Sequence, residues 1–170
     1  MNRNLILSFV FSIICVSVNA QSQVENLLND VAKYNAAFLD KDFEKVVNMT
    51  IPSVVEKAGG TELMTKISIE EGKTIVNSGV YIEKLTPEKP GKIMIAGEDL
   101  HAILPQVVTL TVGKTIVKKQ AYYLASSSDD GKTWTFLDLE PYDIDSIKDF
   151  VPSFTGEIEI PFVEFLSEEK

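Results

Sequence analysis

Apolar residues near the start of the chain recur at the three- and four-residue spacing of an amphipathic helix. This pattern spans residues 23–39 and follows Ser22, which forms a capping-box pattern with Glu25. A helix with one apolar face packs that face against another surface, so we expect this helix to lie on the core of the domain. Its buried face should carry Val24, Leu27, Leu28, Val31 and Phe38.

Three shorter helices are predicted next. Asp42 is placed to cap the first of them, and Pro52 suits the first turn of the second. Gly59 and Gly60 end that helix, and Thr61 is expected to cap a third one that runs to about Asn77. The inner faces of these helices should carry Phe43, Val46, Val47, Val54, Val55, Leu63, Met64, Ile67, Ile69 and Ile75.

From residue 80 onward the apolar period shortens to two, which is typical of β-strands. Pro105 is expected to interrupt one of these strands, and Gly113 marks a tight hairpin turn. Helices followed by an antiparallel meander predict an α+β domain. The predicted strands cover residues 80–85, 92–96, 103–112, 115–125, 133–139 and 156–160, and a short helix covers residues 144–150.

The first twenty residues have the three-part layout of a secretory signal peptide. Arg3 gives a weakly basic start, an apolar run spans residues 5–18, and Val-Asn-Ala at 18–20 suits the signal peptidase. The run is shorter than the ~20 residues that a membrane span needs, so we expect no membrane anchor. We predict cleavage after Ala20, a single mature domain over residues 21–170, and a secreted or periplasmic bacterial protein.

Composition narrows the possible partners and chemistry. The net charge of −9 argues against nucleic acid, whose phosphates need clustered cations. Cys15 is the only cysteine and lies inside the leader, where bulky Ile14 argues against a lipid attachment site, so the mature domain has no disulfide. With His101 as the only histidine, no cluster of histidines can hold a metal, and we expect no metal and no cofactor.

Residues 127–134 read Ser-Ser-Asp-Asp-Gly-Lys-Thr-Trp and match the Asp box, Ser-x-Asp-x-Gly-x-Thr-Trp. In sialidases and related propellers this motif recurs once per blade, but here it occurs once, in a chain too short for a propeller. Asp side chains bond turn amides, and glycine supplies a positive φ. We therefore expect Gly131 to form a structural hairpin turn with Trp134 packed beneath it.

The link between the first two helices carries a resemblance to a known family. It reads Phe-Leu-Asp-Lys-Asp-Phe over residues 38–43, followed by Val-Val at 46–47 and Gly-Gly at 59–60. Over residues 22–140 the chain resembles the nuclear transport factor 2-like superfamily, including secreted bacterial members without an assigned activity. The resemblance implies helices wrapped by a curved antiparallel sheet, which together form a cone with a central pocket.

Members of this superfamily are isomerases, dehydratases or cyclases, or they are binding or dimerising modules, so the resemblance leaves function open. The candidate site residues are His101, Asp99, Asp138, Tyr122 and Tyr123. His101 beside Asp99 fits a general base, although such a histidine is more often a surface or strand-edge residue. No nucleophile elbow or phosphate loop is present, so we expect no hydrolase activity.

Three functions remain as hypotheses. The favoured one is non-catalytic binding of a small apolar ligand or a peptide in the cone. The alternative is a small pocket enzyme in which Asp99 or Asp138 works with Tyr122 or Tyr123, and it requires a carboxylate that points into the cone. The second alternative is an interaction module that forms a homodimer through its sheet face.

Overall fold

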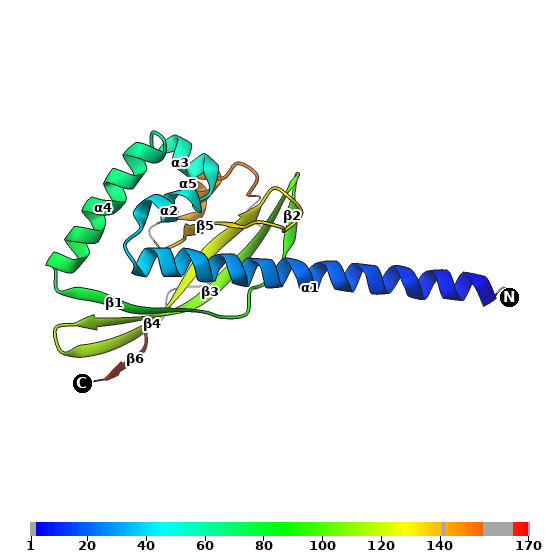
Figure 1. Cartoon of the computed structure of the whole chain (residues 1–170), viewed down its shortest axis with the longest axis horizontal. Coiled ribbons are helices and arrows are strands. Elements are labelled where there is room, and N and C mark those ends of the chain that lie inside the picture. Colours follow the sequence, from blue (N-terminus) through cyan, green and yellow to red (C-terminus); the bar gives the residue numbers. More distant parts are fainter. Residues whose placement is uncertain (1–2, 141, 155–164, 170) are drawn as a thin grey trace.

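A computed structural model describes residues 3–140, 142–154 and 165–169 of the 170-residue chain. Four helices precede the sheet, and a fifth follows most of it (Figure 1). The helices are α1 (Arg3–Leu39), α2 (Phe43–Asn48), α3 (Pro52–Lys57), α4 (Thr61–Asn77) and α5 (Ile144–Phe150). The strands are β1 (Val80–Pro87), β2 (Met94–Ala96), β3 (Asp99–Val112), β4 (Thr115–Ser127), β5 (Thr135–Asp138) and β6 (Phe165–Glu169).

The strands form one antiparallel sheet in the order β1-β3-β4-β5, with β2 on β3 and β6 on β4. The sheet curls into a half-barrel, and the helices close it into a cone. The predicted α+β class is therefore confirmed. The two long strands form its centre, since β3 and β4 pair from Leu100 opposite Ser127 to Val112 opposite Thr115.

Helix α1 lies along the concave face of the sheet. Leu27 and Val31 are fully buried there, as predicted, whereas Val24, Leu28 and Phe38 are half-buried. The helix begins at Arg3 and not at the capping box of Ser22, because its turns continue without a break through the preceding segment. In Figure 1 the first half of α1 extends clear of the other elements.

The predicted ends of the short helices are correct in two cases and wrong in one. Asp42 caps α2 by accepting a hydrogen bond from the backbone N–H of Lys45 at 3.1 Å. Pro52 occupies the first turn of α3, where its missing N–H costs no hydrogen bond. Thr61 is not a cap. Gly60, with φ 95°, holds the capping position of α4, and Thr61 is the first helical residue.

Helix α4 is less buried than its apolar pattern predicts. None of its residues, all of which the structure describes, is fully buried. Leu63, Ile67, Ile69 and Ile75 keep 37–47% of their surface exposed. The helix contacts mainly α2 and β1, so much of its apolar surface faces outward.

Pro105 does not interrupt its strand. Its carbonyl oxygen accepts a hydrogen bond from the backbone N–H of Glu88, just past the end of β1 at Pro87. The missing N–H of Pro105 therefore lies on the side where the neighbouring strand has ended, and the ladder with β4 continues. The expected hairpin turn forms at Gly113, whose φ is 63°. The strand predicted at 156–160 lies outside the described residues, and β6 was not predicted.

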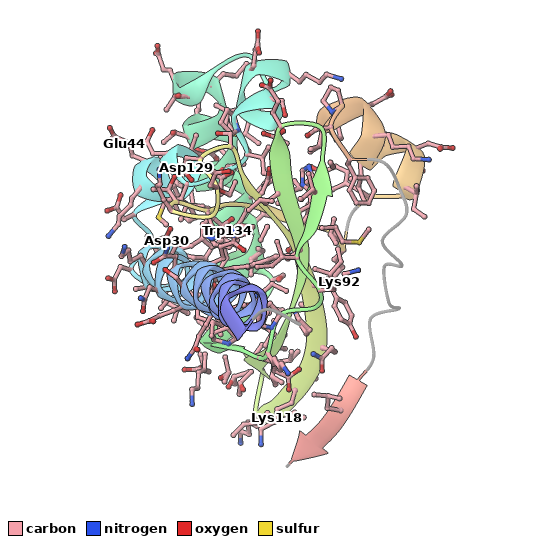
Figure 2. The ribbon with its side chains drawn as sticks, turned by 90° about the vertical axis from the view of Figure 1, so that its right-hand side faces the viewer. Asp30, Glu44, Lys92, Lys118, Asp129 and Trp134 are labelled. Atoms are coloured by element: carbon pink, nitrogen blue, oxygen red, sulfur yellow. The ribbon has the colours of Figure 1, made fainter. Side chains whose placement is uncertain are left out.

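The sheet carries a separate core on each face. Looking along α1, Figure 2 shows α1 on one side of the sheet and α5 on the other. On the α1 side the buried cluster includes Leu27, Tyr34, Trp134 and Phe136. On the α5 side it includes Ile103, Leu124, Ile147 and Phe154. Because side chains alternate along a strand, neighbouring residues of β3 and β4 face opposite cores.

The Asp box forms a tight turn between β4 and β5. The Asp129 carboxylate accepts hydrogen bonds from the Ser127 hydroxyl at 2.8 Å and from the Thr133 N–H at 2.9 Å. Burial pushes the pKa of Asp129 upward, but the hydrogen bonds from Thr133, Ser127 and Lys132 outweigh it and lower the pKa to about 2. Asp129 is therefore ionised at neutral pH and holds the turn closed.

The same turn fastens α1 to the sheet. The side-chain amides of Gln23 and Asn26 donate to the carbonyl oxygens of Asp130 and Gly131, at 3.1 and 2.9 Å. In return, the backbone N–H of Trp134 donates to the Asp30 carboxylate on α1 at 3.0 Å. Figure 2 shows Asp30, Asp129 and Trp134 together on the α1 side of the sheet. These contacts give the Asp box a structural role.

Candidate functional site

The cone contains a cavity of about 300 Å³ between the concave face of the sheet and helices α1, α2 and α4. We call it the cone cavity. Its walls are mainly apolar, and polar groups gather toward the β4–β5 side. The side chains that line it include Tyr34, Phe38, Phe43, Val46, Thr50, Met64, Ser68, Glu71, Ile75, Ile82, Leu85, Gln106, Val108, Lys119, Ala121, Tyr123, Phe136, Asp138, Glu140 and Tyr142.

Three aromatic rings form one wall of the cone cavity. Tyr34 of α1 meets Tyr123 of β4 edge-on, with ring centroids 5.6 Å apart, and Phe136 of β5 lies 5.3 Å from Tyr34. Tyr34 and Tyr123 are 8% and 5% exposed. Burial, followed by the nearby Asp138, raises the pKa of Tyr34 well above its usual value, while the Thr50 hydroxyl acts in the opposite direction. Tyr34 is therefore a neutral phenol at physiological pH.

Tyr123 is also held neutral. Burial raises its pKa most, and Tyr34 and Asp138 raise it further, whereas the Gln106 amide lowers it. Tyr123 and Asp138 are direct cross-strand partners, so their side chains emerge on the same face of the sheet. The structure thus brings together two of the candidate residues, Asp138 and Tyr123, inside the cone.

Asp138 is a partly buried carboxyl group that points into the cavity. Burial raises its pKa, and the negative charge of Glu140 adds to that effect. A hydrogen bond from the Glu140 N–H at 3.0 Å and the positive charge of Lys119 act against it. Lys119 itself is held by the Glu140 carboxylate, with Nζ 2.7 and 2.6 Å from its two oxygens. Among the described residues that line the cavity, Lys119 is the one cation near Asp138, and it is already paired with Glu140.

Gln106 is a buried polar residue in the wall of the cavity. It is fully buried on β3, and its Oε1 accepts a hydrogen bond from Asn35 of α1 at 3.1 Å. Its Nε2 meets no partner in good hydrogen-bond geometry among the described residues, but it lies beside the Tyr123 phenol, and a side-chain hydrogen bond between the two lowers the pKa of Tyr123. Because Nε2 is itself buried, a bound molecule does not reach it, and Gln106 holds Asn35 and Tyr123 in place.

The remaining candidates lie on the opposite face of the sheet. His101, Asp99 and Tyr122 alternate with the residues of the cone and face the α5 side. His101 is not a surface residue, because it is only 1% exposed, with Nε2 3.1 Å from the Ser153 hydroxyl and its ring edge-on to Phe154. Burial lowers its pKa, although Asp99 acts in the opposite direction, and keeps the ring neutral. These three residues cannot act with Asp138 in the cone.

Two important residues of the cavity were missed by the sequence reasoning. Tyr34 lies three residues after Val31 and seven after Leu27, so the helical period already places it on the buried face. Gln106 lies on β3 directly after Pro105, which was expected to break the strand, and the period of two was therefore not followed through it. The contact between Gln106 and Asn35 had no sequence signal.

In the part of the chain that the structure describes, His, Cys, Asp and Glu side chains form no group of three that could hold a metal ion. None of the helices within the described residues is both long enough and apolar enough to cross a membrane.

Comparisons with known proteins add no relative. The chain matches no protein family, no curated protein and no solved structure with which it was compared.

Proposed function

We propose that the chain binds a small, uncharged and mainly apolar molecule in the cone cavity. The observation that carries this proposal is a cavity of about 300 Å³ with mainly apolar walls and a few polar groups among them. Binding pockets of this size take small molecules, and a few placed polar groups orient them. Affinity comes mainly from apolar surface that leaves water.

The polar groups favour an uncharged oxygen over an anion. Tyr34 and Tyr123 are neutral donors, whereas Glu71, Asp138 and Glu140 bring acidic groups to the same cavity. Lys119 cannot balance them all, because Glu140 already binds it. A ketone or ester oxygen accepts from the neutral donors without the repulsion that a carboxylate meets. The other occupant predicted from the sequence, a peptide, fits a cavity of this volume less well.

A thermal-shift series tests the proposal. Small apolar ketones and esters, each paired with its carboxylic acid, are added to the chain and to two variants of β4. Ala121→Phe fills the cavity, since Ala121 is buried and lines it. Gln120→Phe is the matched control, because the neighbouring residue faces the other side of the strand. We expect ketones or esters to raise the melting temperature of the unmodified chain and of Gln120→Phe only. Equal shifts in Ala121→Phe contradict the proposal.

Acid–base catalysis is the second candidate function. The enzyme alternative required a carboxylate that points into the cone, and Asp138 does so beside Tyr123. A carboxyl group with a raised pKa can donate a proton or a hydrogen bond to a ligand oxygen at neutral pH. Turnover of a bound ketone or ester that Asp138→Asn abolishes, while the fold and binding persist, favours the enzyme. Binding without turnover favours the binding domain.

We also propose export and membership of the nuclear transport factor 2-like superfamily. The order of helices and the curled sheet around a cavity support the superfamily, and the first half of α1, which extends away from the body, supports a removable leader (Figure 1). Mass measurement of the protein from its native host tests the leader, with Gln21 expected as the first residue. A homodimer through the sheet face stays a prediction, which sedimentation equilibrium tests.

A further inference from the structure

A second hollow, of about 590 Å³, lies on the outside of the cone. We call it the outer groove. It is bounded by the end of α1, the C-terminal half of α4 and the start of β1 (Figure 1), and its walls are mostly apolar. Leu39, Ile69 and Tyr81 line it and keep 37%, 37% and 51% of their surface exposed. A hollow of this volume has the size of a small-molecule site.

The outer groove is closed off from the cone cavity. The Phe43 ring stands between the two and packs directly on the backbone of Gly72, because a Cβ placed there would lie only 2.6 Å from Cζ of the ring. Phe38 supports this ring edge-on, with the two centroids 6.4 Å apart. The outer groove is therefore a separate compartment, and what binds in it does not depend on what binds in the cone.

The two compartments differ in charge. Among the described residues, those that line the outer groove include two lysines, Lys41 and Lys73, and no acid. The cone cavity has the opposite balance, with carboxyl groups at Glu71, Asp138 and Glu140. A lining with cations alone stands out in a chain whose net charge is −9. An apolar groove with this lining suits a molecule that is both apolar and negatively charged.

Of the two lysines, Lys41 is the one available to a ligand. Lys73 Nζ lies 2.8 Å from the Glu70 carboxylate, which neutralises it. No ion pair or side-chain hydrogen bond joins Lys41 to another residue in the part of the chain that the structure describes. Asp40 and Asp42 flank it in the sequence but do not line the groove.

The backbone of Lys41 gives an independent reason to assign it a function. Its φ is 61°, and its N–H donates to the carbonyl oxygen of Phe38 at 3.1 Å, while the Asp42 N–H donates to that of Ala37 at 2.9 Å. A residue that closes a helix with positive φ is usually glycine, because a Cβ is strained in this conformation. Such strain is concentrated at functional positions. The lysine side chain offers what glycine lacks, a cation at the edge of the groove.

We propose that the outer groove binds an amphiphile with a linear alkyl chain and an anionic head, such as a medium-chain carboxylate. The head pairs with the Lys41 ammonium, and the alkyl chain covers Leu39, Ile69 and Tyr81. Burial of the alkyl chain supplies most of the affinity, and Lys41 selects the sign of the head. This site is additional to the proposed function of the cone.

Calorimetric titration with decanoate and decylammonium, below their micelle concentrations, tests the inference. Lys41→Gly and Lys41→Asn both remove the cation, and both new residues accept a positive φ. Lys66→Gln is the matched control, because Lys66 is exposed on α4 and lines neither compartment. We expect the Lys41 variants to bind decanoate about two- to fivefold more weakly, as the loss of an exposed ion pair predicts. Lys66→Gln should bind it unchanged.

Three further variants locate the alkyl chain. Ile69→Trp and Val76→Trp each fill the outer groove, which both residues line without lining the cone cavity, and two such variants keep the test decisive if one does not fold. Ile67→Trp is their control, since Ile67 is 43% exposed on α4 but lines neither compartment. Thermal melts without ligand establish that each variant folds. We expect decanoate binding to be lost in the groove variants and kept in Ile67→Trp and in Ala121→Phe, whose cone is filled.

Several results would overturn the inference. Decanoate affinity that is unchanged in both Lys41 variants removes the anionic contact. Decylammonium that binds more tightly than decanoate, and whose binding the groove variants abolish, reverses the sign of the head. Loss of decanoate binding in Ala121→Phe alone moves the alkyl chain into the cone. Absence of any decanoate binding contradicts the outer-groove site and leaves the proposed function of the cone standing.

Discussion

Gly131→Ala tests how the Asp-box turn holds α1. Gly131 has φ 79°, a backbone conformation that residues with a Cβ rarely adopt. A Cβ placed there would also lie 2.5 Å from Cγ and 3.0 Å from Cβ of Gln23 on α1. Gln23 must therefore rotate away, which breaks its 3.1 Å hydrogen bond to the carbonyl of Asp130.

The magnitude follows from these two effects. The left-handed backbone costs about 1–2 kcal/mol for an L-residue. Loss of the Gln23 hydrogen bond adds about 0.5–1.5 kcal/mol. We therefore expect Gly131→Ala to lower the free energy of unfolding by about 1.5–3.5 kcal/mol. Gly113→Ala is the matched control, since φ is 63° there but no described atom outside the neighbouring residues lies within 4 Å of the new Cβ. It should lose only the backbone part, about 1–2 kcal/mol.

Urea unfolding of both variants, monitored by circular dichroism, compares their free energies of unfolding. The reasoning is refuted if Gly131→Ala and Gly113→Ala lose the same stability, because the contact with α1 then contributes nothing. A double-mutant cycle with Gln23→Ala separates the clash from the backbone strain, since truncation removes the Cγ that the new Cβ meets. In that cycle the cost of Gly131→Ala should fall. Ligand binding well below the melting temperature should not change.

Further predictions concern the two cores. Val31→Ala should lower the free energy of unfolding by about 1–4 kcal/mol, and by more than Leu28→Ala, because Val31 is fully buried and Leu28 only partly. Equal losses of stability in urea would contradict the assignment of this face of α1 to the core. Because burial lowers the pKa of His101, the unfolded chain binds more protons below about pH 6.5, so stability should fall as the pH drops below that value. His101→Gln should reduce this slope, and an unchanged slope excludes His101 as its source.

Local signals predicted the short elements well. The cap of Asp42, the Pro52 turn and the bounds of α5 depend on residues within one or two turns, so the sequence is sufficient for them. The hairpin at Gly113 is equally local. The cap of Gly60 was missed because threonine is a common cap, whereas the backbone here puts the glycine, with its positive φ, in that position.

Long-range packing could not be predicted in the same way. The apolar period of α4 is real, but whether Ile67 or Ile69 finds a partner depends on elements far away in the chain, and in the structure both stay exposed. Likewise, the sequence alone did not distinguish Asp99 from Asp138 as the carboxylate that points into the cone. Only strand register separates them, because a shift of one residue exchanges the two faces of the sheet. The register of β4 with β5 places Asp138 opposite Tyr123, and alternation along β3 leaves Asp99 on the other face with His101.

The central claim is that ligand binds inside the cone. Methyl NMR spectra recorded with and without a ketone or ester from the thermal-shift series test it without any substitution. We expect chemical-shift changes at Val46, Leu85 and Val108, which line the cone cavity, and none at Ile147 and Val151 on the α5 side of the sheet. Changes confined to Ile147 and Val151, or a spectrum that does not change at saturating ligand, contradict the claim.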